Sequence, residues 1–399
     1  MRDINKYSDY INEVYLYFEL RNKNLLSPLK TAVNLVFWWF FFVPVCFFLF
    51  FIYFFILTLI PRRFSHNKNS KVCIARTFAT RNKLRFLEKE SVVFYKESAF
   101  IFSEDNNLYN FHIGFRLRIF LYAFNVFVTD SYKLGFELSS RLDVCAMIRA
   151  IGFYIVRFPH KVAFHSYFNF FVKVTSPEII ITGNKEDRFA LVEQTVSKKN
   201  NVKLICYPHG LEYGVTLPRG VVGDRFYCYS EKTASIYKSI YKATGQEFIF
   251  DFKVVKSLLG KSIIKPVSVK PKVVFFPESR GIDVNRKIIS ILMASKINFY
   301  LKLHPLDKFN NYVECGVEES QLIKDFDDAI VGNIVIARKS TVLLEAVYSG
   351  STSCAVLFDS QDMQDFKTQF PSLSDERIMQ VKNIAELLEW LVPEESHPE

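Results

Sequence analysis

The sequence lacks the short glycine patterns that mark several classes of nucleotide-binding and hydrolytic proteins. It contains no GxxxxGK[ST] loop, no GxGxxG and no GxSxG. The first of these would cradle phosphates with backbone N–H groups, and the last would expose a nucleophilic serine. The sequence also has no internal repeat and no low-complexity tract. These absences exclude a P-loop protein, a hydrolase with a nucleophile elbow and a repeat architecture.

The cysteines are few and scattered, and none of them stand in CxxC spacing. There are seven, and Cys73, Cys206 and Cys228 fall inside apolar runs that are typical of strands. An odd, scattered set predicts buried free thiols in a reducing compartment. No cleavable signal peptide is expected, since the first thirty residues are polar and the apolar run that follows is too long.

Nucleic acid is not an expected partner, although the formal net charge is +10. The sequence has no compact Lys/Arg stripe interleaved with aromatic residues, no zinc-ligand spacing and no helix-turn-helix pattern. The positive charge instead suits an anionic membrane surface and a phosphorylated substrate.

A long apolar stretch, residues 32–60, contains no charged residue. A membrane span needs about 20 apolar residues, so residues 31–62 are predicted to be a membrane segment. Either one tilted helix crosses the bilayer, or a helical hairpin breaks at Pro44 and returns both ends to the cytoplasmic face. The positive-inside rule does not choose between them, because both flanks are basic. The flanking basic residues are Arg21, Lys23, Lys30, Arg62, Arg63, Lys68 and Lys71.

The N-terminal segment, residues 1–30, contains an amphipathic pattern. Ile11, Val14, Tyr15 and Phe18 follow the i, i+3, i+4, i+7 spacing of one helix face. Such a helix could lie on the membrane surface or pack on a later domain. The same two alternatives, interfacial or core, apply to the aromatic helices predicted at 115–127 and 161–175.

The rest of the chain alternates strands and helices, which predicts an α/β fold with open, largely parallel sheets. A first domain is expected at 70–255, a linker at 256–271, a second domain at 272–380, and a closing helix and tail at 381–399. The predicted strands are 71–78, 91–95, 177–184, 202–210, 224–230, 272–277, 297–305, 320–324, 333–340 and 351–358.

In the second domain, polar residues follow the strands where α/β folds bind ligands. His304 ends one strand, and Arg280 follows another within PESRG. Ser340 and Thr341 stand where a strand meets a helix, so their hydroxyls could cap the helix or bind a phosphate. Glu345, on that helix among apolar residues, is expected to point to solvent or to a ligand hydroxyl.

The first domain repeats this placement. An apolar strand delivers His209, and Glu212 follows it; either could act as the general base that deprotonates an acceptor hydroxyl. Asn184, Asp187 and Arg188 follow the preceding strand and are candidate acceptor-binding residues, or else a helix cap and an ion pair.

No metal site and no cofactor are predicted. Asp325 and Asp327 form a DxD pattern, which can bind a metal ion. They are interpreted here as the start of a helix, where carboxylates interact favourably with the helix dipole.

Three motifs in order, HG at 209–210, HP at 304–305 and S-[ST]-x-x-x-E-A at 340–346, carry a resemblance. The set resembles GT-B fold glycosyltransferases of bacterial surface polysaccharides over about residues 175–360. It is most similar to capsule and lipopolysaccharide enzymes that use CMP-activated sialic acid or Kdo. It is more distantly similar to the glycerol-phosphate polymerases of teichoic acid synthesis.

The resemblance implies two Rossmann-like domains with a cleft between them and metal-independent transfer. By it, His304, Ser340 and Thr341 bind the donor phosphate, Glu345 contacts the donor's ribose or sugar, and His209 lies near the reacting centre. Two positions depart from the family patterns. Glu212-Tyr213-Gly214 keeps one acid where the sialyltransferases have two, and Arg338-Lys339 stand where the phosphotransferases have an Asp.

The expected activity is therefore transfer of a sugar from a nucleotide-sugar donor to a lipid-linked or polysaccharide acceptor. The expected location is the inner (plasma) membrane of a bacterial cell, with the catalytic domains on the cytoplasmic face. Three alternatives stay open: a polyol-phosphate transferase that uses CDP-glycerol, an epimerase of the same fold, and a non-catalytic scaffold of a polysaccharide assembly complex.

Overall fold

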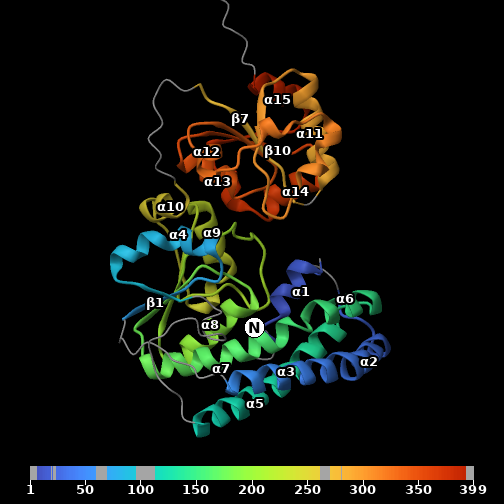
Figure 1. Cartoon of the computed structure of the whole chain (residues 1–399), viewed down its shortest axis with the longest axis vertical. Helices are drawn as coiled ribbons and strands as arrows, with labels where there is room; N and C mark the ends of the chain where they lie inside the picture. The colour runs from blue at the N-terminus through green and yellow to red at the C-terminus, as the bar shows by residue number, and fades with distance from the viewer. Residues whose placement is uncertain are drawn as a thin grey trace, which may run out of the picture. The chain divides into compact units, whose positions relative to one another are not determined.

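A computed structural model describes residues 7–18, 20, 24–59, 70–95, 113–260, 270–279 and 281–391. It divides into two compact units, each described here by itself (Figure 1). The first comprises Met1–His209, Thr216–Phe226 and Tyr241–Glu247, and the second comprises Gly210–Val215, Tyr227–Ile240 and Phe248–Glu399. Most of the expected linker, at 261–269, and the tail at 392–399 lie outside the described residues.

The predicted α/β class with parallel sheets is confirmed. In the first sheet the strand order is β2-β1-β3-β4-β5-β6, and the pairs from β2 to β5 are parallel. Hydrophobic runs such as Ile179–Thr182 are buried on nearly every residue, as in a sheet covered on both faces. The strands are β1 Lys71–Ile74, β2 Val93–Tyr95, β3 Ile179–Thr182, β4 Lys203–Cys206, β5 Arg225–Cys228 and β6 Glu247–Phe250.

The second sheet has the order β11-β10-β9-β7-β8, again parallel. Its strands are β7 Val273–Phe276, β8 Phe299–Leu301, β9 Ile334–Ala337, β10 Thr352–Val356 and β11 Ile378–Val381. The helices of this unit are α9 Glu231–Ile240, α10 Phe252–Leu259, α11 Ile282–Ala294, α12 Phe326–Ile330, α13 Val342–Tyr348, α14 Ser360–Thr368 and α15 Ile384–Leu391.

The strand predicted at 320–324 is wrong. Glu319–Gln321 form a turn of 3-10 helix with a capping box at Glu318, and only Leu322 makes a bridge, to Leu301. The apolar pair Leu322-Ile323 suggested a strand, but the capping side chains of Glu318 and Gln321 hold the backbone in a tight turn instead.

The apolar stretch is one continuous helix, not a hairpin. It runs through α2 Pro28–Phe37, a π-helical turn Trp38–Phe42 and α3 Val43–Leu59. The wide turn, with Val43 N–H donating to Trp38 O, comes directly before Pro44. A π-turn relieves the clash that a proline ring would make with the preceding turn, so the break that the hairpin alternative required at Pro44 does not occur. Among the described residues, Pro28–Ile56 is the one helix long and apolar enough to cross a membrane.

One stripe of this helix is fully buried inside the first unit. Every fourth residue from Asn34 to Phe54 has no exposed surface: Asn34, Trp38, Phe42, Cys46, Phe50 and Phe54. The stripe packs on α5 Ile113–Ser139, α6 Val144–Tyr154 and α7 Arg157–Thr175, with which it forms a helical layer (Figure 1).

The two aromatic helices differ in burial. α7 is a core helix, because Phe164 and its neighbours are buried and pack on Phe189 of α8 Arg188–Lys199 at 5.3 Å. α5 buries one face and exposes the other, which carries Leu117, Leu121 and Tyr132.

The amphipathic helix α1, Ile11–Tyr17, packs on the first unit. Glu13 is ion-paired with Arg188 at 2.5 Å, and Asn12 Nδ2 donates to Gly220 O at 2.9 Å. Of the two alternatives for this segment, packing on a later domain is confirmed.

The packing of the apolar helix on α5 yields a direct test. A Cβ on Gly135 of α5 would lie 2.3 Å from Trp38 Nε1, so Gly135→Ala must displace the indole. We expect it to lower the free energy of unfolding by about 1–3 kcal/mol, measured by thermal or denaturant unfolding in detergent.

Gly152→Ala on α6 is the matched control, because no atom lies within 4 Å of its Cβ. It should raise the free energy of unfolding by about 0.5–1 kcal/mol, since alanine is the better helix former. Equal effects of the two substitutions would show that Trp38 does not pack on Gly135.

Candidate functional site

Both sheets have a topological switch point, and the predicted residues flank both. In each sheet the second strand lies on one side of the first strand, and the third strand lies on its other side. Numbered along the chain, the strand order is 2-1-3-4-5-6 in the first sheet and 2-1-3-4-5 in the second, the doubly wound arrangement. Ligands of such sheets bind outside the carboxyl ends of the strands at this point. In the first unit it lies between β1 and β3, and in the second between β7 and β9.

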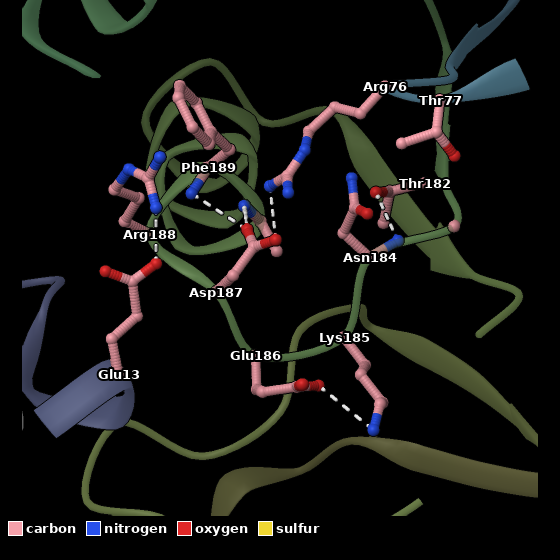
Figure 2. A network of polar contacts seen from close by, with 12 residues as sticks. Glu13, Arg76, Thr77, Thr182, Asn184, Lys185, Glu186, Asp187, Arg188 and Phe189 are labelled. Atoms are coloured by element: carbon pink, nitrogen blue, oxygen red, sulfur yellow. Dashed lines mark hydrogen bonds and ion pairs between the residues drawn. The ribbon is translucent and has the colours of Figure 1, made fainter. Parts of the chain in front are cut away.

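An ion pair crosses the first switch point. Arg76, after β1, contacts Asp187, after β3 (Figure 2). Asp187 also caps α8, since Oδ1 accepts from Phe189 N at 3.0 Å and Ala190 N at 2.9 Å. Burial raises the pKa of Asp187, but Arg76 and the cap hydrogen bonds outweigh it, and the net pKa is lowered. The cap and ion-pair interpretation of Asp187 is therefore confirmed.

Asn184 lies at the same edge and is 2% exposed. Its backbone N–H donates to Thr182 Oγ1 at 3.1 Å, and its side-chain amide points toward Arg76 (Figure 2). Nδ2 has no hydrogen-bond partner among the described residues. A buried donor without an acceptor costs about 1–3 kcal/mol, so this amide is the group best suited to an incoming ligand oxygen.

His209 lies in the loop after β4 and is partly buried. Its Nδ1 lies 2.6 Å from Gly183 O, and a carbonyl can only accept, so Nδ1 carries the proton. Burial lowers the pKa of His209, and the Gly183 hydrogen bond opposes this only in part. The neutral ring therefore has a lone pair on Nε2, which can accept a proton.

Glu186 is a titratable group that the sequence did not single out. Burial raises its pKa to about 7, although Lys185, 3.5 Å away, opposes the shift. Only its position between two candidate residues could have pointed to it.

Two other candidates of the first domain are occupied in the structure. Arg188 turns away from Asp187 and pairs with Glu13 of α1 (Figure 2). Glu212 is fully buried, and its Oε1 accepts from Tyr229 N at 2.6 Å. Of His209 and Glu212, His209 is the one whose geometry suits a base.

The second switch point is lined by a charge network. Arg338 pairs with Asp362 at 2.5 Å and with Glu278 at 3.6 Å. Lys339 pairs with Asp362 at 2.9 Å and with Asp365 at 2.5 Å. Both cations are therefore paired with carboxylates.

The network fixes the backbone of the loop after β9. Glu278, after β7, accepts from Lys339 N at 2.9 Å. Burial raises the pKa of Asp362, but hydrogen bonds from Arg338 and Lys339 outweigh it, and the net pKa is lowered. The loop that precedes Ser340 is thus tied to both α14 and the β7 loop.

Ser340 and Thr341 lie at the end of that loop. Ser340 Oγ accepts from Val342 N at 3.3 Å, so it acts in part as a turn cap. Glu345 is 6% exposed, so it does not point to solvent. Arg280 lies outside the described residues.

His304, after β8, has the opposite tautomer to His209. Its Nδ1 accepts from Leu306 N at 3.1 Å, so this nitrogen carries no proton. The proton of the neutral ring is then on Nε2, and the exposed ring offers an N–H donor. Such a donor suits a phosphate oxygen.

The DxD pattern forms the start of a helix, as interpreted. Asp325 caps α12 by accepting from Asp328 N at 2.8 Å. Within the described part of the chain, no three His, Cys, Asp or Glu side chains gather as metal ligands.

No protein-family model and no curated protein matches the sequence. The function is therefore argued from the geometry of the site and from the sequence motifs.

The raised pKa of Glu186 predicts a pH dependence. The folded state holds the proton of the Glu186 carboxyl more tightly than the unfolded state does. The free energy of unfolding of the wild type therefore falls as pH rises from 4.5 through about 7. The glutamine of Glu186→Gln does not titrate, so this variant does not lose that free energy as pH rises. Relative to wild type it should gain about 1–3 kcal/mol of unfolding free energy across that window, measured by denaturant titration at several pH values.

Below pH 4.5 the wild-type carboxyl is protonated in both states, so the difference between the two proteins should be constant there. A difference that does not change between pH 4 and pH 8 would contradict the raised pKa.

Proposed function

We propose that the protein is a metal-independent glycosyltransferase of GT-B type, attached to the cytoplasmic face of a bacterial plasma membrane. It transfers a sugar from a nucleotide-sugar donor to a lipid-linked or polysaccharide acceptor. The second unit binds the donor and the first binds the acceptor.

The observation that carries the proposal is the pair of opposite histidine tautomers. His304 offers an N–H, which is what a leaving nucleotide phosphate needs. His209 offers a lone pair, which is what a nucleophilic hydroxyl needs. Both follow parallel strands at the sheet edge, as in other open α/β sheets that bind ligands.

The roles of the other residues follow from their positions. Ser340 and Thr341 contact the donor phosphate from the loop that Glu278 holds. The resemblance assigns Glu345, which is 6% exposed, to the donor's ribose or sugar. Asn184 donates its unpartnered amide to an acceptor oxygen.

The donor class is tested by thermal shift of the purified protein with CMP, CDP, UDP, GDP and their sugar conjugates. At a ligand concentration of about 100 Kd the stabilisation is about 2.7 kcal/mol, which raises Tm by several degrees. We expect a selective shift that Ser340→Ala abolishes. No shift with any nucleotide overturns the enzyme proposal in favour of a scaffold, and turnover of CDP-glycerol with transfer of phosphate would favour the polyol-phosphate transferase.

Asparagine and glutamine can each replace one nitrogen of a histidine ring, and such variants test the roles of the two histidines. His209→Asn keeps a donor to Gly183 O but removes Nε2, so turnover should fall about 10²- to 10⁴-fold with nucleotide binding retained. His304→Asn keeps an acceptor for Leu306 N–H but loses the outward donor, so donor binding should weaken about 10- to 100-fold.

His304→Gln is the matched control, because its amide can supply the outward N–H. It should bind the donor more tightly than His304→Asn does. Equal loss in both variants would mean that His304 acts only through the turn that it forms with Leu306.

A further inference from the structure

The apolar helix Pro28–Leu59 is flanked in the sequence by two elements that belong to one folded body. Before it, α1 is fixed by Glu13–Arg188, and Asp9 pairs with Arg219 at 2.7 Å. After it, β1 lies inside the first sheet, between β2 and β3. A helix that crossed a bilayer would place these two flanks on opposite sides, which this packing does not allow.

The packed part of the helix is also as long as the hydrocarbon core of a bilayer is thick, so no unpacked part of that length remains to cross it. The buried stripe from Asn34 to Phe54 extends over about 30 Å at 1.5 Å per residue, which equals the hydrocarbon thickness. It contacts the unit along this length. Asn34 Nδ2 donates to Ser139 O at 3.1 Å, Trp38 Nε1 donates to Ser131 O at 3.1 Å, and the Phe50 ring lies 5.0 Å from that of Phe127.

The opposite face of the helix is apolar and exposed. Phe40, Phe48 and Phe55 are 75%, 64% and 61% exposed. This face continues onto α5, because the half-exposed Phe51 contacts Phe120 with ring centroids 5.5 Å apart. A contiguous apolar surface of this kind marks a membrane or protein interaction site.

The exposed charges of the segments that form this layer suit an anionic membrane. The exposed charged residues of 24–59 and 113–157 are four cations and one carboxylate. The cations are Lys30, Arg118, Arg149 and Arg157, and the carboxylate is Asp143. Cationic side chains beside an apolar helix face are attracted to anionic headgroups.

We infer that Pro28–Leu59 lies in the plane of the membrane, embedded in one leaflet together with the outer face of α5, and does not cross. The protein is then monotopic, and α1 and the sheet lie on the same side of the bilayer. This inference shares membrane attachment with the proposed function but does not depend on the transfer chemistry.

Spin labels at Phe40→Cys, Phe48→Cys and Phe55→Cys test it, in full-length protein reconstituted into vesicles with anionic lipid. Cys145→Ser and Cys315→Ser remove the two cysteines that are not buried. Depth is measured from collision with oxygen and with a water-soluble nickel chelate. An in-plane helix places all three labels in lipid at nearly equal depth. A crossing helix separates the first from the last by about 22 Å along its axis.

A difference in depth of that size between the first and last labels would overturn the inference. Labels shielded from both reagents by a second copy of the chain would overturn it too. Labels freely accessible to the aqueous chelate would overturn it as well.

Ser27→Cys and Ser70→Cys, on the exposed residues that flank the helix, give a second test. A membrane-impermeant maleimide should label both from the same side of sealed vesicles, and labelling from opposite sides would overturn the inference. Thermal shift with the nucleotide panel on the same samples reports the transferase proposal separately, so either proposal can fail alone.

Discussion

Lateral packing of the apolar helix on α5, α6 and α7 is the constraint on which the first unit depends. A free membrane helix would leave Asn34 in lipid with its amide unsatisfied, at a cost of several kcal/mol. Here Asn34 donates to both Ser139 O and Leu142 O, the second at 2.6 Å. The same helix thus serves as a core element on one face and as an apolar surface on the other. Helices α5, α6 and α7 pack against its inner face.

A buried charge cluster ties this layer to the N-terminal segment. Lys161 of α7 has no exposed surface and contacts Asp130 of α5 and Asp9, the latter at 3.3 Å. Burial lowers the pKa of Lys161, and Asp9 opposes the shift. Removing one partner of a buried pair costs about 3–5 kcal/mol because the other charge is left unpaired. Three segments distant in the sequence are therefore held in one arrangement beside the apolar helix.

The candidate site has a different physical basis. Each switch point is crossed by an ion pair that fixes loops, Arg76–Asp187 in the first sheet and Arg338–Glu278 in the second. What remains for a ligand is a set of neutral hydrogen-bonding groups: the Asn184 amide, the Ser340 hydroxyl and two histidine rings. Their direction is set by single backbone contacts, to Gly183 O for His209 and from Leu306 N for His304.

The sequence predicted the α/β class, the parallel sheets and the position of His209 and His304 next to strands, because hydrophobic periodicity and turn residues are local signals. It placed both histidines at strand ends, whereas β4 ends at Cys206 and β8 at Leu301. It also indicated Asp187 as a helix cap. The folded structure alone established that Glu212 and Glu345 are buried, that Arg188 pairs with Glu13, and which ring nitrogen each histidine offers. It also decided that the stretch around Pro44 is a single helix with one packed face. The pairing of Arg188 with Glu13 joins residues far apart in the sequence, and no local pattern encodes it. The histidine tautomers depend on single hydrogen bonds to Gly183 and Leu306, whose geometry the residue types alone do not reveal.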